Sequence, residues 1–243
     1  DSSSLKIEKN ASLVLHKGAE IILNGSSSSL NIEGRIILLE GAKFQPTVHK
    51  NNKFGQIEFI ANESGNFESY GSNEIQFNGL TSDKKLRIIV KNGELVFPSN
   101  LEEISFNNIE VILDATSAIS LSSKAKIENS NILGEFKSPG IFVKGGGKVD
   151  VKSVVFKDLF SGLTQTTDSS SLVVENSFFN SCESGFISSN GNFQLKNSSF
   201  QNNVTGLLIN YLDTSLVYSC AFKSNSIGIQ VRGGELSKLR VEN

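Results

Sequence analysis

The sequence predicts an all-β fold, a right-handed parallel β-helix of about 11 coils with roughly 22 residues in each coil. A repeat in the last third of the chain carries this prediction, because a Phe is followed six residues later by a Gly and then by an apolar residue. The repeat occurs four times, at Phe156/Gly162/Leu163, Phe179/Gly185/Phe186, Phe200/Gly206/Leu207 and Phe222/Gly228/Ile229. The four units are nearly equal in length. Such a period indicates stacked, equivalent units that bury their apolar faces against one another.

Alternation inside the unit predicts strands rather than helices. In Ser177-Phe178-Phe179 the first and third residues are expected to face inward, which is the period of two of a β-strand. The unit is predicted to hold three short strands, Leu172–Val174, Ser177–Phe179 and Gly185–Ile187. Strands of successive coils then lie parallel and about 4.8 Å apart, and crossovers between parallel strands are almost always right-handed.

Bends and core positions recur in the same register. Three residues before each repeated Phe lies an Asn or a Ser, at Ser153, Asn176, Asn197 and Ser219. Asn tolerates the left-handed backbone of a sharp bend, and stacked amides can bond to one another along the helix axis. The four Phe rings are expected to form one continuous inward stack. The repeated Gly is expected where the chain turns back into its next strand.

The pattern predicts a single domain over residues 1–243, with regular coils over 125–243 and less regular coils over 1–124. The segment Leu13–Ala19 recurs 23 residues later as Ile36–Ala42, so the period is present at both ends. A polar stretch around Pro46 predicts a loop excursion near residues 44–56, or else a longer solvated turn. The chain ends within a coil at Asn243, which indicates a fragment of a longer protein.

Two stretches, Val174–Asn180 and Leu195–Asn203, resemble the repeats of pectate-lyase-like right-handed β-helix proteins, in which an Asn marks a tight turn. The resemblance covers residues 125–243. It implies the fold, and it does not imply one activity, because proteins of this fold have many functions.

Composition excludes several classes of partner. The net charge is −2, with 23 basic and 25 acidic residues, and no block of like charge reaches five residues. Nucleic acid and direct membrane insertion are therefore not expected. Cys182 and Cys220 are 38 residues apart. That spacing separates them by about 8 Å along the axis, too far for a disulfide, so both are predicted to be buried free thiols.

No catalytic, cofactor-binding or metal-binding residue is predicted, no cofactor is expected, and the chain is not expected to be an enzyme. The best acidic constellation combines Asp150 and Asp158 with Lys152 and Lys157, and solvated outward charge explains it. No two of the seven Asp residues are adjacent: Asp1, Asp83, Asp114, Asp150, Asp158, Asp168 and Asp213. His16 and His49 flank no carboxylate cluster, and Gly145-Gly146-Gly147 is predicted to be a turn.

A second resemblance concerns function. Four Phe-x-x-Asn sequences and the segment Gly233-Gly234-Glu235-Leu236 resemble repeats of chlamydial polymorphic outer-membrane proteins and, more widely, autotransporter passenger domains, although Glu235 stands where Ala is expected. The four begin at Phe59, Phe97, Phe200 and Phe222. The resemblance implies a secreted or cell-surface passenger, exported to a bacterial outer membrane.

Such a passenger would act as an adhesin or structural scaffold without catalysis. It would bind a protein or glycan on a host or neighbouring cell, and it would associate with itself end to end. The alternative is a carbohydrate-binding or polysaccharide-degrading β-helix whose active site lies partly outside this chain.

Overall fold

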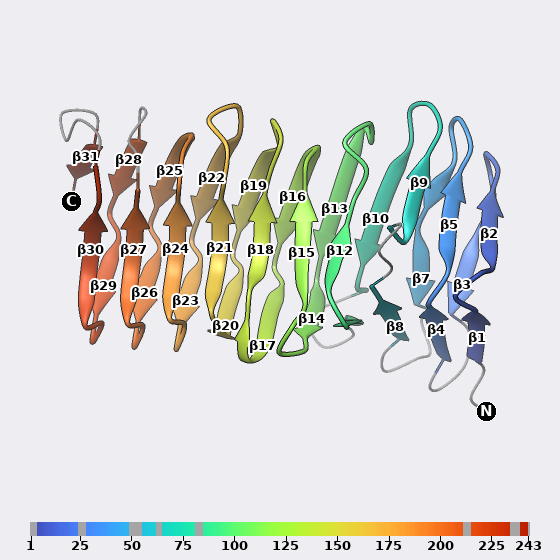
Figure 1. Ribbon diagram of the computed structural model, residues 1–243, viewed down its shortest axis with the longest axis horizontal. Coiled ribbons are helices and arrows are strands. Elements are labelled where there is room, and N and C mark those ends of the chain that lie inside the picture. Colours follow the sequence, from blue (N-terminus) through green and yellow to red (C-terminus); the bar gives the residue numbers. More distant parts are fainter. Residues whose placement is uncertain are drawn as a thin grey trace.

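The chain forms one stack of coils with three faces, each covered by parallel strands (Figure 1). The computed structural model describes residues 4–23, 28–48, 55–61, 65–80, 85–210, 215–233 and 239–242. Within these ranges the secondary structure is all β, with no helix. The predicted all-β parallel solenoid is therefore confirmed.

The three faces are called the first, second and third face. Within each coil the chain passes along the first face, then the third and then the second, as in β20, β21 and β22. The first face is a ten-stranded sheet of β1 (Ser4–Ile7), β4 (Ser28–Ile32), β8 (Gly55–Ile60), β11 (Leu86–Lys91), β14 (Ile109–Leu113), β17 (Asn131–Ser138), β20 (Val155–Leu159), β23 (Phe178–Asn180), β26 (Ser199–Gln201) and β29 (Ala221–Lys223). The second face has 11 strands, β3 (Ile21–Leu23), β6 (Lys43–Phe44), β7 (Pro46–Val48), β10 (Glu74–Asn78), β13 (Glu103–Asn107), β16 (Lys124–Glu128), β19 (Lys148–Lys152), β22 (Ser171–Glu175), β25 (Asn192–Lys196), β28 (Ser215–Tyr218) and β31 (Leu239–Glu242).

The third face is divided into two sheets. A three-stranded sheet contains β2 (Ser12–Leu15), β5 (Arg35–Leu38) and β9 (Phe67–Ser69). A seven-stranded sheet contains β12 (Glu94–Val96), β15 (Ala118–Leu121), β18 (Gly140–Val143), β21 (Ser161–Gln165), β24 (Ser184–Ser188), β27 (Thr205–Ile209) and β30 (Ile227–Val231).

Coil length is nearly constant late in the chain and variable early in it. On the first face the aligned residues of the late coils follow one another at almost equal spacing, at Phe156, Phe179, Phe200 and Phe222. The aligned residues of the early coils lie further apart, and their spacing grows with each coil, at Leu5, Leu30, Ile57 and Ile88. Ten successive strands on the first face correspond to about nine turns, and not to the predicted 11 coils. The prediction divided the chain by the length of the late repeat, and the early coils are longer than that.

The repeated Phe residues form the predicted inward stack. Ring centroids of Phe156, Phe179, Phe200 and Phe222 lie 4.7, 4.6 and 4.8 Å apart, with interplanar angles of 4°, 1° and 7°. The first three rings are fully buried, and Phe222 is half-buried because its strand, β29, is the last of the first face. The predicted register is confirmed.

The repeated glycines serve close packing and not backbone freedom. Gly162, Gly185, Gly206 and Gly228 are not among the residues with positive φ. A Cβ on Gly185 would lie 2.7 Å from Cδ1 of Phe200 and 2.6 Å from the carbonyl oxygen of Gly206, so a larger residue would displace the next coil. The expectation of a turn glycine was wrong, since all four residues lie inside strands β21, β24, β27 and β30, and the first three lie against the Phe ring of the following coil.

Residues with a left-handed backbone conformation form the corners between faces. Between the second and first faces Asn129, Ser153, Asn176, Asn197 and Ser219 have φ from 48° to 56°, as the Asn/Ser ladder predicts. A second ladder at the corner between the first and third faces was not predicted and comprises Asp158, Ser181, Asn202 and Ser224. At each kind of corner one left-handed Asn donates its side-chain amide to the Asn just before the corresponding bend of the preceding coil. Asn129 Nδ2 donates to Asn107 Oδ1 at 3.2 Å, and Asn202 Nδ2 donates to Asn180 Oδ1 at 3.1 Å.

The first part of the segment predicted as a loop excursion, near residues 44–56, continues the second face. Pro46–Val48 form strand β7, which pairs with β3 and β10 on the second face. Proline is tolerated as the first residue of a strand, because at that position the hydrogen-bond ladder does not need its missing N–H group. Residues 49–54 lie outside the described part of the chain.

Candidate functional site

The third face is interrupted between β9 and β12, which are the facing end strands of its two sheets (Figure 1). On the other faces the same two coils remain paired, β8 with β11 and β10 with β13. The interruption is therefore confined to one face. A groove with a volume of about 700 Å³ lies there, which is within the usual size of a ligand site.

Two buried asparagines tie β9 to the preceding coil. Asn66 Nδ2 donates to the carbonyl oxygen of Gly34 at 3.2 Å. Asn73 Nδ2 donates to the carbonyl oxygen of Leu38 at 3.3 Å, and its Oδ1 accepts the N–H of Ala42 at 3.0 Å. Since both ends of β9 are bonded toward the N-terminal coils, the strand follows the three-stranded sheet.

The corner before β12 is held by the following coil. The Asn92 N–H donates to Asp114 Oδ2 at 3.0 Å and the Gly93 N–H donates to Ser117 Oγ at 3.4 Å. Burial acts to raise the pKa of Asp114, but hydrogen bonds from Ser117 Oγ and from the N–H groups of Asn92 and Thr116 outweigh it and hold the pKa below its ordinary value. The charged Asp114 therefore fixes β12 toward the C-terminal coils.

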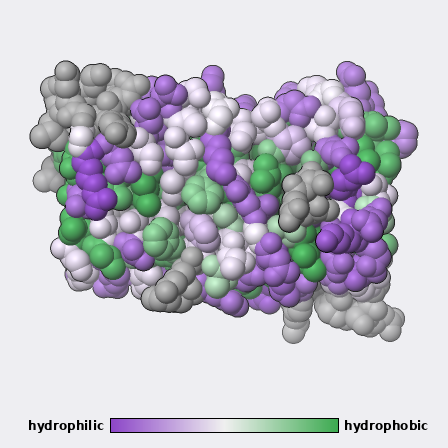
Figure 2. Space-filling model, in the orientation of Figure 1, coloured by the Kyte–Doolittle hydropathy of each residue, from purple (hydrophilic) through white to green (hydrophobic). Residues whose placement is uncertain are grey.

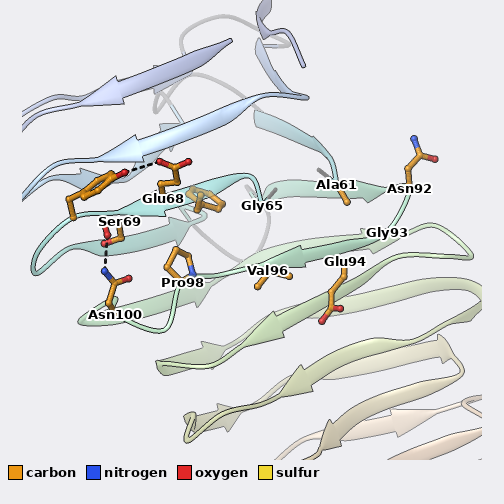
Figure 3. A pocket seen from close by; sticks show the side chains of 12 residues that line it. Ala61, Gly65, Glu68, Ser69, Asn92, Gly93, Glu94, Val96, Pro98 and Asn100 are labelled. Carbon is orange, nitrogen blue, oxygen red and sulfur yellow. Dashed lines mark hydrogen bonds between the residues drawn. The ribbon is translucent and has the colours of Figure 1, made fainter. Parts of the chain in front are cut away.

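The groove has an aromatic floor and a mixed rim (Figure 3). The buried ring of Phe67 lines the groove and stacks on the buried ring of Phe97, with centroids 5.2 Å apart. On the rim the side chains of Tyr70 and Val96 are 58% and 41% exposed, beside Pro98. Figure 2 shows apolar and polar residues interspersed over this face of the molecule.

Both ends of the groove are closed by contacts between the two coils. The Ala61 N–H donates to the carbonyl oxygen of Lys91 at 2.8 Å. At the other end Asn100 Nδ2 donates to the carbonyl oxygen of Ser69 at 2.7 Å. The groove is thus a short slot between two coils, open between these contacts.

Two carboxylates line the groove and point away from each other (Figure 3). Glu68 forms an ion pair with Arg35 of β5 and accepts the hydroxyl of Tyr70 at 3.2 Å. Glu94 forms an ion pair with Lys144, beyond β18, at 2.5 Å. Hydrolysis of a glycosidic bond needs two carboxyl groups that converge on the bond. These two are instead held by partners on opposite sides of the groove.

The acidic constellation from the sequence is not brought together. Asp150 and Lys152 are exposed on β19 of the second face, whereas Lys157 and Asp158 belong to β20 on the first face and pair with each other at 3.5 Å. His16 is exposed after β2, and His49 lies outside the described residues. Gly145 and Gly146 have φ of 50° and 81° in the predicted turn between β18 and β19. In the described ranges, no three His, Cys, Asp or Glu side chains gather as a metal ion would require.

The later Phe-x-x-Asn sequences have a structural role. Asn203 Oδ1 accepts the N–H of Cys182 at 2.9 Å, and its Nδ2 donates to the carbonyl oxygen of Phe179 at 3.1 Å. Asn225 makes the same two bonds one coil later, to Asn203 and to Phe200. Asn100 instead closes the groove, and Asn62 lies outside the described residues.

Both cysteines are free thiols, as predicted, but the prediction that both are buried was wrong for Cys220, which lies in the corner before β29, the last strand of the first face among the described residues, and is covered on one side only. Cys182 is buried in the slot that Asn203 occupies one coil later, and burial raises the pKa of its thiol to about 11. Cys220 is half-buried, and burial raises its pKa as well.

The groove residues were missed because sequence reasoning followed the regular repeat and searched for clustered Asp. A usable signal was present between the two regular regions. Asn92-Gly93 and Pro98 punctuate the short strand β12, and the coil from Ile57 to Ile88 is the longest between aligned residues of the first face. Both features predict a coil that departs from the common path.

A family model described as the right-handed β-helix region matches residues 88–243, more than half of the chain. The chain belongs to the right-handed β-helix family. The match begins within β11, so the β12 wall of the groove lies inside it and the β9 wall lies before it. No curated protein and no solved structure matched the chain. The described residues include no helix that is long and apolar enough to cross a membrane.

Proposed function

We propose that this right-handed β-helix is a non-catalytic passenger domain of a secreted or cell-surface protein, and that it acts as an adhesin through the groove between β9 and β12. The observation that carries the proposal is a groove with exposed apolar side chains, Tyr70 and Val96, whose two carboxylates are already held in ion pairs. Such a surface gains binding energy by burying apolar area against a partner. The partner is a protein or glycan on a host or neighbouring cell.

The sequence resemblance to autotransporter passengers supports export to a bacterial outer membrane. In this chain the Asn residues of two Phe-x-x-Asn sequences bond to the preceding coil, so the motif follows from coil geometry. The motif therefore favours the wider class of passenger β-helices over the chlamydial polymorphic outer-membrane proteins in particular.

The groove itself can be tested by adhesion. Beads coated with the chain are added to cultured epithelial cells and to bacterial cells, and bound beads are counted. The double variant Tyr70→Ser/Val96→Ser should bind at about a third of the wild-type level or less, because small polar side chains bury less apolar area. Phe160→Ser/Val204→Ser is the matched control, since it removes apolar side chains that are 43% and 54% exposed outside the groove. Equal loss in both variants would argue against the groove.

The competing function is polysaccharide degradation, with part of the active site outside this chain. It is favoured by the presence of Glu68 and Glu94 in one groove. The chain is incubated with a panel of plant, bacterial and animal polysaccharides, and reducing and unsaturated ends are measured. We expect no release above the blank. Release that disappears in Glu68→Gln or Glu94→Gln would replace the adhesin proposal with an enzyme.

A further inference from the structure

We propose that the groove between β9 and β12 binds an extended peptide segment of the partner as an added β-strand. The inference rests on the proposed adhesive function and specifies the chemistry of the partner, namely a polypeptide in extended conformation. The backbone groups along the two walls of the groove carry the argument, because they are the ends of two interrupted hydrogen-bond ladders.

The β9 wall presents unpaired backbone groups to the groove. The N–H of Tyr70 donates to the carbonyl oxygen of Leu38 at 2.9 Å, and the carbonyl oxygen of Asn66 accepts the N–H of Ile36 at 2.8 Å. Both bonds point toward β5. Backbone groups of successive residues in a strand point to opposite sides. The N–H and C=O of Phe67 and the N–H of Ser69 therefore point into the groove.

The β12 wall presents the complementary row. The carbonyl oxygen of Gly93 accepts the N–H of Ala118 at 3.3 Å, and the N–H of Phe97 donates to the carbonyl oxygen of Ser120 at 3.2 Å. These bonds point toward β15, so the N–H and C=O groups of Glu94 and Val96 point into the groove. Among the described residues neither β9 nor β12 has a strand partner on this side.

An extended peptide is the occupant that these two walls fit. Alternating N–H and C=O groups at strand spacing are satisfied by another backbone, and unpaired strand edges are common sites of strand addition. Each wall is three residues long, so about 10 Å of peptide, or roughly three residues, can pair with it. A glycan would use the ring of Tyr70 and the side-chain amides and would leave the backbone rows to water.

The side chains around the groove select a pattern in the peptide. Peptide side chains that point inward would meet the buried ring of Phe67, so they should be apolar. Peptide side chains that point outward would lie beside Val96 and between Glu68 and Glu94, so Lys or Arg, whose long apolar stem can cover Val96, is favoured there. The expected segment alternates apolar and basic residues.

The test uses a phage-displayed library of random heptapeptides, panned on the immobilised chain, followed by affinity measurements with the enriched synthetic peptides. Val96→Pro removes one N–H that points into the groove and keeps the bonds toward β15. It should weaken peptide binding about tenfold or more, which corresponds to about 1.4 kcal/mol. Val96→Ile keeps both the N–H and a β-branched apolar side chain, so its affinity should stay within about threefold of wild type.

A second measurement does not depend on the folding of a variant. Each amide of the best peptide is N-methylated in turn, and the peptides are tested against the wild-type chain. We expect several single methylations to abolish binding while the side chains are unchanged, because they remove backbone donors. Equal affinity of methylated and unmodified peptides would overturn strand addition, as would the absence of any enriched peptide or equal binding to Val96→Pro.

The two proposals can fail separately. Suppose that cell adhesion is lost in Tyr70→Ser/Val96→Ser but is unchanged in Val96→Pro, and that a glycan array gives the same pattern. The adhesive function would then stand and the peptide inference would fall. If no adhesion to any cell is found while peptides bind as described, the peptide site stands and the adhesive function falls.

Discussion

The late coils and the early coils of this β-helix differ in how Phe rings pack in the interior. From Phe156 to Phe222 identical rings stack nearly parallel, with centroids 4.6 to 4.8 Å apart. In the early coils most Phe pairs meet edge to face, as in Phe44 with Phe77 at 70° and Phe97 with Phe106 at 83°. Stacked pairs occur among them and form no continuous column. Equal coil lengths place the same residue over itself, whereas the lengthening coils of the N-terminal part do not.

The difference shows where a solenoid can hold a specific site. In the late coils every neighbour is alike, so the surface repeats and no position is distinguished. In the early coils the spacing between aligned residues is longest from Ile57 to Ile88, and the third face opens there and at no other place among the described residues. The groove is a consequence of broken periodicity.

The largest expected effect is on the Phe stack. Phe200→Ala should lower the free energy of unfolding by about 3 to 5 kcal/mol, because rings on both sides keep the neighbouring coils from collapsing into the cavity. Urea denaturation followed by circular dichroism measures the change. Phe160→Ala is the control, and its exposed ring should matter by less than about 1 kcal/mol. A change of that small size for Phe200 would contradict the stack.

A smaller effect is expected at the repeated glycines. Gly185→Ala should cost about 1 to 3 kcal/mol, because the new Cβ would meet the Phe200 ring and the Gly206 carbonyl below van der Waals distance. Gly228 holds the same slot in the last coil, where the nearest atom is Phe222 Cβ at 3.5 Å. Gly228→Ala should therefore change the unfolding free energy by less than about 0.5 kcal/mol. Equal costs at both sites would show that contact with the next coil is not the reason.

Stability should also depend on the Cys182 thiol at high pH. Its pKa in the folded protein is about 11, above the ordinary value of 9.0, so the folded state keeps the proton longer. The stabilisation is complete below pH 9 and is lost as the pH rises through 11, with a limit of about 3 kcal/mol. Urea midpoints of wild type and Cys182→Ala between pH 8 and 11 measure it as the difference between two profiles. Parallel profiles would contradict the burial of this thiol.

The smallest effect concerns the open edge of the late coils. In the 243-residue chain β29 and β30 are each the last strand of their sheet. We expect their amides to exchange with deuterium faster than those of β23 and β24, and we expect the chain to associate end to end as its concentration rises in sedimentation experiments. Equal protection in a sample that stays monomeric would contradict this prediction.

The repeat predicted the late coils well because each of its positions has one dominant physical requirement. The Phe200 ring fills the interior of the coil, and Asn197 adopts the left-handed conformation of the bend. Val217 faces inward two residues before the equivalent bend at Ser219. The role of Gly185 was misassigned, since sequence alone does not separate a glycine that is needed for conformation from one that is needed for space. The second left-handed ladder was missed because its residues vary among Asp, Ser and Asn.

The groove could not be predicted from the same pattern. It depends on bonds between residues of different coils that lie far apart in sequence, such as those from Asn73 to Ala42 and Leu38. The coils concerned have different lengths, so no fixed period links Asn73 to its partners. Asp114 and Asn92 present the same difficulty, because a corner of one coil is fixed by the turn of the next.

The uniform register of the late coils makes the length of the molecule adjustable. Phe178 pairs with Ser199 and Phe179 with Phe200. Removal of residues 178–198 would therefore join Ser177 to Ser199 and place the Phe156 ring against that of Phe200. The groove would keep its walls and move about 4.8 Å closer to the C-terminal end. Duplication or loss of one repeat would therefore change the distance between the groove and the C-terminal coil in steps of one strand spacing.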